Sequence, residues 1–178
     1  MDVMEALLTR RSQRNYTRET VTDAELRRIV RAGMYAPSGH DRRPWLFLTV
    51  RDRAKMRQLM PLSPWWAMLE TAQAIIVVCA DTRLLNGIPV EFGIDSCCAA
   101  SQNMLLAAHG LGLGGVWLGI CEGHESYERF KAVLGIPDYA RVVSMIAVGR
   151  PAETKEAEER MDCGKWFLET WGSPAPEG

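Results

Sequence analysis

The chain has 178 residues, 47% of them hydrophobic and 24% charged, and its 21 basic and 22 acidic side chains leave a formal net charge of −1. These values are typical of one globular domain with a sizeable core, which we expect over 1–171, with a flexible tail over 172–178. The balanced charge argues against a nucleic-acid or membrane-surface binder, and no apolar run approaches the ~18 residues of a membrane-spanning helix. Five cysteines without a CxxC motif disfavour disulfides or structural zinc and indicate the cytoplasm.

Hydrophobic periodicity and capping residues divide the chain into helices and strands. The expected elements, in chain order, are a helix after Asp2, a helix after Thr22, a strand at 45–50, a helix at 52–60, a strand at 74–80, a helix at 91–109, a strand end at 116–118, a helix at 125–134 and a strand at 141–148. This order predicts an α+β fold with mixed strand directions and helices packed on the sheet. The helix at 91–109 is apolar or small on most sides, which indicates burial in the core or a subunit interface.

A basic loop follows the first helix and contains Arg10, Arg11, Ser12 and Arg14. Arginine binds phosphate through a bidentate fork, and a hydroxyl adds a further hydrogen bond. The same residues also fit a solvated basic end of a helix, which the helix dipole favours. The spacing alone leaves both interpretations open.

A glycine-rich turn at 110–115 reads GLGLGG and matches G-x-G-x-x-G. A dinucleotide-binding fold needs a strand before this motif and a helix after it. Here the predicted helix comes first and the strand second, so we reject that interpretation. The glycines then serve either as a helix C-cap or to let backbone N–H groups approach a flat ligand.

Two further segments hold polar residues beside predicted strands. The loop before the first strand combines turn and charged residues, among them Pro37, Ser38, Gly39 and Asp41. It suits a functional loop and a solvated loop equally well. After the last strand, Arg150, Lys155 and Arg160 by themselves fit surface charges better than ligands.

Acid–base and metal chemistry find little support in the residues. The three histidines form no dyad with a nucleophile, and the sequence contains no HExxH, no paired metal ligands and no P-loop lysine. Cys97 and Cys98 suit small core residues rather than a reactive thiol. We therefore expect no metal site and no catalytic side chain, but a cofactor that supplies the chemistry.

Four collinear segments, from residue 5 to about 168, together resemble the FMN-dependent nitroreductase family. RRSQRNY resembles the family's RRSxRxF/Y box, and YAPSGHDRRPW resembles its APSxxNxQPW loop. DSCCAASQNMLLAAHGLGLGGVWLGI resembles its central helix and following turn, and AVGRPAE with ERMDCGKWF resembles its C-terminal GxPAE segment. The resemblance implies a nitroreductase-like α+β fold with a central mixed, mainly antiparallel sheet flanked by helices, in an intertwined homodimer with FMN at the subunit interface.

The resemblance also assigns the cofactor-binding residues. It matches Arg10, Ser12 and Arg14 to residues that hold the phosphate and ribityl chain of the flavin, with Arg14 near the pyrimidine edge, and we expect Arg11 to bind the cofactor as well. The backbone of Leu118 and Gly119 matches the stretch that faces flavin N5. The remaining expected contacts are the late basic residue Arg160 on the phosphate and the loop residues Pro37, Ser38, Gly39 and Asp41.

The loop departs from the family pattern at two positions. Asp41 stands where the family has Asn, and Arg43 where it has Gln. An ionised aspartate only accepts hydrogen bonds, and its charge opposes a reduced, anionic flavin. Neutralisation of Asp41 by Arg43 would remove that conflict, and we expect an altered flavin potential or pose.

The implied activity is a ping-pong oxidoreductase. NAD(P)H delivers hydride to flavin N5 and leaves, and an electron-poor acceptor such as a nitroaromatic or quinone takes its place. Trp65 and Trp66 either line the cleft or pack in the core or an interface. The alternatives are a flavin-binding storage or sensing protein without turnover, a related dehalogenase or flavin-degrading enzyme, for which we see no lid segment, and a nucleotide- or nucleic-acid-binding module, which the charge balance disfavours.

Overall fold

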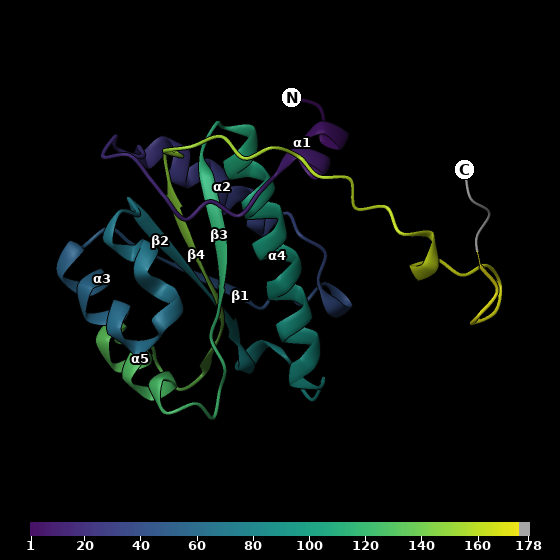
Figure 1. Ribbon diagram of the computed structural model, residues 1–178. Coiled ribbons are helices and arrows are strands. Elements are labelled where there is room, and N and C mark those ends of the chain that lie inside the picture. The colour runs from purple at the N-terminus through teal and green to yellow at the C-terminus, as the bar shows by residue number, and fades with distance from the viewer. Residues whose placement is uncertain (175–178) are drawn as a thin grey trace.

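A four-stranded antiparallel sheet forms the centre of the computed structural model, which describes residues 1–174 (Figure 1). The strands are β1 (Trp45–Val50), β2 (Ala74–Asp81), β3 (Gly114–Gly119) and β4 (Ala140–Gly149), in the spatial order β1-β2-β4-β3. The helices are α1 (Val3–Thr9), α2 (Asp23–Met34), α3 (Arg53–Leu59), α4 (Val90–Gly110) and α5 (Ser126–Leu134). Short 3-10 segments are η1 (Gly39–Asp41), η2 (Met60–Leu62), η3 (Pro64–Glu70), η4 (Thr82–Leu84) and η5 (Cys163–Lys165).

The five α-helices and four strands lie close to the expected ranges, whereas the 3-10 segments, η3 among them, were not predicted. Capping boxes form at Asp2 with Glu5 and at Thr22 with Glu25, and each satisfies backbone N–H groups at a helix start. The α+β class is confirmed. Within residues 1–174 the parallel component of the sheet is confined to an isolated bridge between Ser12 and Gly115. None of the helices in this range is long and apolar enough to cross a membrane.

One face of the sheet is covered by α2 and α4. Their apolar sides pack on Ile76 and Val78 of β2 and on Ile146 of β4, all fully buried. Small residues on α4 allow close approach, so that Ser101 Oγ lies 2.8 Å from Ser144 Oγ of β4. This contact and the apolar packing together hold α4 on the sheet.

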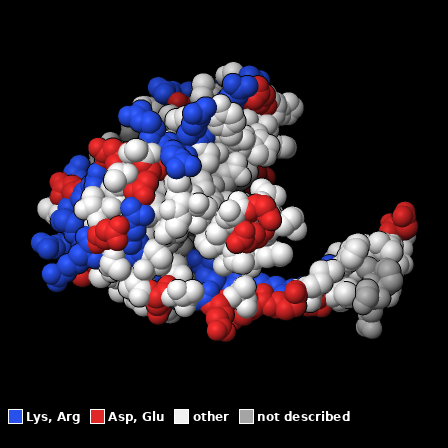
Figure 2. All heavy atoms as spheres, turned by 90° about the horizontal axis from the view of Figure 1, so that it is seen from above, with Lys and Arg blue, Asp and Glu red and all other residues white. Residues whose placement is uncertain are grey.

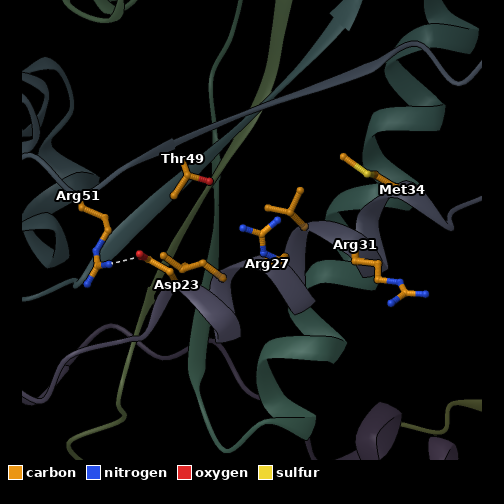
Figure 3. A pocket seen from close by; sticks show the side chains of 8 residues that line it. Asp23, Arg27, Arg31, Met34, Thr49 and Arg51 are labelled. Atoms are coloured by element: carbon orange, nitrogen blue, oxygen red, sulfur yellow. Dashed lines mark hydrogen bonds and ion pairs between the residues drawn. The ribbon is translucent and has the colours of Figure 1, made fainter.

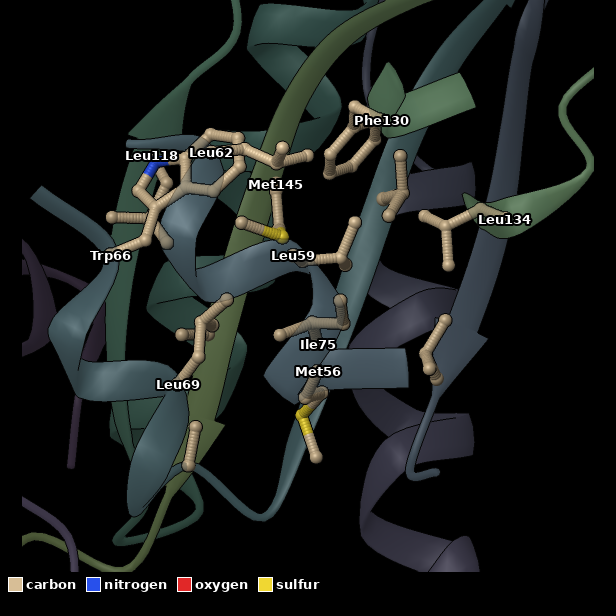
Figure 4. Packing of buried hydrophobic residues seen from close by; sticks show 14 of the residues in the cluster. Met56, Leu59, Leu62, Trp66, Leu69, Ile75, Leu118, Phe130, Leu134 and Met145 are labelled. Carbon is tan, nitrogen blue, oxygen red and sulfur yellow. The ribbon is translucent and has the colours of Figure 1, made fainter. Parts of the chain in front are cut away.

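The opposite face is covered by α3, α5 and the 3-10 segments η2 and η3 (Figure 4). Phe130 of α5 is fully buried and meets the Trp66 ring edge-on, with the ring centroids 5.7 Å apart. Met56, Leu59 and Met145 are also fully buried in this cluster. Burial of large apolar side chains stabilises by about 1.5–3 kcal/mol each, and here it holds η3 against the sheet.

The chain after β4 leaves the body as an extended arm (Figures 1 and 2). Its first residues are tied to the N-terminal segment. The Ala152 N–H donates to the Asn15 carbonyl at 3.0 Å, and Arg11 Nε donates to the Glu156 carbonyl at 2.9 Å. Beyond these bonds the arm projects away from the domain that it belongs to.

The flexible tail expected over 172–178 stays a prediction, and its first residues, 172–174, are described. The Leu168 N–H donates to the Ser173 carbonyl at 2.8 Å, and Phe167 pairs with Pro174 in an isolated bridge. Residues 172–174 therefore belong to a turn that folds back on the arm. Residues 175–178 lie outside the described residues.

Candidate functional site

The basic loop at 10–14 runs beside β3, which is an edge strand of the sheet. Ser12 forms its parallel bridge with Gly115, and the Gln13 N–H donates to the Gly115 carbonyl at 3.1 Å. This contact separates two cavities along β3. Arg10 lines one of them and Arg14 lines the other.

The first cavity has a volume of about 210 Å³ and a strongly basic wall. Burial, and then the nearby charges of Arg160 and Arg11, lower the pKa of Arg10. Within residues 1–174 no carboxylate forms an ion pair with Arg10. A half-buried guanidinium that faces other cations is unfavourable, and a bound anion would remove this penalty.

Two of the basic residues near the site are held by other groups. Arg11 Nε donates to the Glu156 carbonyl, and its Nη2 donates to the Glu158 carbonyl at 3.4 Å. Arg150 pairs with Glu25 of α2 at 2.8 Å. Arg11, which we expected to bind a ligand, lines the first cavity. Two of its N–H donors, however, are used to hold the arm.

The second cavity has a volume of about 490 Å³ and lies at the far end of β3. Arg14, Leu118 and Gly119 line it, so the structure brings these three expected residues together. A Cβ added at Gly119 would meet no atom within 4 Å, so the cavity reaches the backbone there. An edge strand also leaves backbone N–H and carbonyl groups unpaired on its outer side.

The loop at 37–43 does not reach either cavity. The Gly39 N–H donates to Ser96 Oγ at 3.2 Å, near the start of α4. The basic loop instead meets the last turn of α4, where Thr9 Oγ1 lies 2.8 Å from His109 Nε2. The helix rises about 20 Å between Ser96 and His109, at 1.5 Å per residue. One chain alone therefore keeps the expected residues Pro37, Ser38, Gly39 and Asp41 apart from the basic loop.

Asp41 is neutralised inside its own loop. Arg43 Nε and Nη2 donate to the two carboxylate oxygens of Asp41, each at 2.7 Å. These hydrogen bonds hold the pKa of the Asp41 carboxyl below its usual value. His40, Asp41 and Arg43 have φ of 52°, 52° and 48°, a strained conformation that is concentrated at functional sites.

Three residues of the cavity walls were not predicted from the sequence as ligands: Gln13, Lys155 and Trp117. Oε1 of Gln13 is buried and has no hydrogen-bond partner in the described part of the chain. Lys155 Nζ donates to the Ser12 carbonyl at 3.2 Å, and Trp117 lines the second cavity. Gln13 lies inside the segment RRSQRNY, so the motif itself could have identified it. Lys155 and Trp117 are recognised only from the packing.

A larger cavity, of about 680 Å³, lies elsewhere, between α2 and β1 (Figure 3). Arg27, Arg31, Met34 and Thr49 are among its lining residues. None of the expected binding residues lines it, so cavity size alone does not locate the site. Within residues 1–174 no group of His, Cys, Asp and Glu side chains is arranged to hold a metal ion.

Comparison with known proteins agrees with this geometry. The model of the Nitroreductase family matches residues 7–65 and 62–150. A "Putative NADH dehydrogenase/NAD(P)H nitroreductase" of Methanothermobacter thermautotrophicus is 39% identical over 171 residues, covering 96% of this chain and 88% of that protein. The "NADPH-flavin oxidoreductase" of Vibrio harveyi is 28% identical, covering 90% of this chain and 70% of that protein.

The fold has a solved counterpart with a bound flavin. The crystal structure of a "putative nitroreductase in complex with fmn" from Desulfovibrio desulfuricans is 31% identical and has a TM-score of 0.84. It covers 96% of this chain and 98% of that chain. Because the family model matches most of the sequence and the structures agree over nearly the whole chain, this protein belongs to the nitroreductase family.

Proposed function

We propose that this protein is an FMN-dependent NAD(P)H oxidoreductase that reduces electron-poor acceptors such as nitroaromatics or quinones. The observation that carries the proposal is the pair of cavities along β3. One of them adjoins Arg10, which has no ion-pair partner in the described part of the chain, and the other combines Arg14, an aromatic wall and open backbone at Gly119. A ligand with an anionic end and a flat ring fits this arrangement.

The residues of the first cavity fit the phosphate end of FMN. Burial first, and then repulsion by Arg160 and Arg11, lower the pKa of Arg10, and a bound phosphate would offset both effects. The unpartnered Oε1 of Gln13 would accept a hydrogen bond from a ribityl hydroxyl. When bound, FMN supplies the hydride-accepting and hydride-donating chemistry at N5.

The second cavity fits the flavin ring and the substrates. Arg14 would place positive charge at the pyrimidine edge and stabilise negative charge on the reduced ring, while the backbone at Leu118 and Gly119 would face N5. We propose ping-pong exchange, in which NAD(P)H gives up its hydride and leaves before the acceptor enters. Among the described residues no carboxylate or histidine lines this cavity, so solvent supplies the proton.

A second copy of the chain would complete the site. The loop at 37–43 lies too far from the basic loop to meet the same ligand within one chain, so we assign it to the site of the partner. Apolar side chains are available for such an interface: Val3 is 71% exposed, Leu8 64% and Trp171, on the arm, 90%. Figure 2 shows a largely uncharged surface beside the arm. We propose a homodimer in which each arm covers the other chain.

An absorption spectrum before and after anaerobic addition of NADH or NADPH tests the proposal. We expect a flavin spectrum that bleaches on addition of the nicotinamide and recovers when a quinone or nitroaromatic is added. A flavin spectrum that never bleaches would replace the enzyme with a storage or sensing protein. A protein that neither contains nor takes up FMN would overturn the proposal. The cytoplasmic location stays a prediction from the cysteines, all five of which are free thiols.

A further inference from the structure

One wall of the first cavity, which we assign to the phosphate of FMN, comes from the end of α4. His109, in the last turn of this helix, lines the cavity together with Arg10. The carboxyl end of a helix carries partial negative charge, which disfavours a nearby anion. A cation on this turn would therefore favour a bound phosphate, and His109 is the basic residue of the turn.

Hydrogen bonds fix which nitrogen of His109 is free to take up a proton. Thr9 Oγ1 donates to the Glu5 carbonyl at 2.6 Å, so it accepts from His109 Nε2–H at 2.8 Å. The neutral ring then carries no proton on Nδ1, and within residues 1–174 no protein group forms a hydrogen bond with that atom. A second proton adds to Nδ1 and leaves the contact with Thr9 in place. The ring can therefore become a cation without losing its anchor.

The charges around His109 come from α1, from the basic loop and from the arm. The charged or titratable groups that line the cavity or act on the ring are the N-terminal residue Met1, Glu5, Arg10, Arg11, Glu153 and Lys155. Glu153 lies 3.4 Å from Lys155 and is paired with it. Burial, and then the charge of Arg10, lower the pKa of His109, whereas Glu5 raises it. A phosphate beside Arg10 would offset the effect of that arginine and favour the protonated ring.

We infer that His109 is a further phosphate-binding residue, which takes up a proton from solvent when FMN binds and strengthens the binding of FMN at mildly acidic pH. This inference rests on the proposed function. Coupling between two binding equilibria is reciprocal, so a phosphate that favours the proton on His109 is itself favoured by that proton. Riboflavin carries the same ring and ribityl chain without the phosphate, and its binding should not be linked to His109.

Fluorescence titration of the flavin-free, full-length chain with FMN and with riboflavin tests the inference, at pH 7 and at pH 5.5. At pH 7 we expect wild type and His109→Gln to bind FMN nearly alike, because His109 is then neutral before FMN binds. At pH 5.5 His109→Gln should bind FMN about threefold more weakly than wild type, the effect of one partly exposed charge interaction. The two proteins are compared at the same pH, which cancels the titration of the phosphate and of the other groups.

Two further variants serve as controls. His109→Lys, which is charged at both pH values, should bind FMN at pH 7 about threefold more tightly than His109→Gln does. His124→Gln removes an exposed histidine that does not line the first cavity, and it should match wild type with both flavins. Riboflavin should bind to wild type and to the His109 variants alike at either pH.

The outcomes separate this inference from the proposed function. Equal FMN affinities of wild type and His109→Gln at pH 5.5 would overturn the inference and leave the flavin site intact. An equal weakening of FMN and riboflavin in His109→Gln would also overturn it, because His109 would then act through the fold and not on the phosphate. Wild-type protein that binds neither flavin at pH 7 would overturn the proposed function itself.

Discussion

At the scale of single residues, the candidate site depends on which charges are left without partners. Arg10 and Arg11 are neighbours of the same type, yet Arg11 binds carbonyls of the arm and Arg10 has no carboxylate partner in the described residues. The sequence predicts a basic cluster, but it does not show which arginine holds the arm and which one remains available for a ligand. The Arg11 bond to Glu156 spans 145 positions, a distance over which no local pattern carries information.

His109, in the last turn of α4, contacts Thr9, the residue before the basic loop. This contact makes the stability of the folded protein depend on pH. Thr9 Oγ1 donates to the Glu5 carbonyl at 2.6 Å, so it accepts from His109 Nε2–H at 2.8 Å. Burial, and then the charge of Arg10, lower the pKa of His109 below its ordinary value of 6.5. As the pH falls below that value, the unfolded chain takes up the proton first, so the folded state loses stability until the folded-state pKa is passed.

We therefore expect His109→Gln, which keeps an N–H donor but does not titrate, to reduce the loss of Tm between pH 7 and pH 5.5. Thermal unfolding followed by circular dichroism measures this loss. His124→Gln is the matched control, because His124 is an exposed histidine outside the basic loop. An equal loss of Tm in wild type and His109→Gln would contradict the role assigned to His109.

At the scale of elements, the packing of the N-terminal segment on β4 positions the basic loop. The Tyr16 ring lies directly on Gly149, and the Tyr16 hydroxyl donates to the Gln13 carbonyl at 2.5 Å. Buried as it is, this hydroxyl has a raised pKa and stays protonated. The sequence predicts β4 well, but the need for glycine at its end follows only from the approach of the ring.

We expect Gly149→Ala to lower the free energy of unfolding by about 1–3 kcal/mol, as overpacked positions do. The new Cβ would lie 2.6 Å from Tyr16 ring atoms, so the ring and the attached loop must move. FMN affinity should fall as well. Urea unfolding and fluorescence titration with FMN measure the two effects.

Gly110→Ala provides the control for this substitution. A Cβ at Gly110 meets no atom within 4 Å, and alanine is the better helix former. We expect Gly110→Ala to leave stability unchanged or slightly increased. If Gly149→Ala were as stable as wild type and bound FMN normally, the contact with Tyr16 would not position the loop.

At the scale of the whole molecule, α4 is so long that one chain cannot bring the expected cofactor-binding residues of the 37–43 loop and of the basic loop together. The loop at 37–43 is held near Ser96 and the basic loop near His109. Two chains would bring these halves together, as proposed above. This arrangement can be tested with two inactive variants, because each variant would spoil a different half of the site.

We expect Arg10→Ala and Ser38→Glu each to bind little FMN as homodimers. A mixed dimer of the two should retain one intact site, formed by the basic loop of the Ser38→Glu chain and the 37–43 loop of the Arg10→Ala chain. Its FMN content, measured after purification through two different tags, should be about half that of wild type. Mixed dimers without FMN would show that each site lies within one chain.

The sequence by itself determined those features that depend on residues close together in the chain. The type and order of the elements, both capping boxes and the basic loop follow from periodicity, capping and motif spacing, which are properties of neighbouring residues. Only the tertiary structure decided which arginines remain free, that Trp65 is exposed while Trp66 is buried, and that the 37–43 loop lies apart from the basic loop. These outcomes depend on contacts between distant segments, such as the bond of Arg150 to Glu25 across 125 positions, and packing of the whole chain determines them.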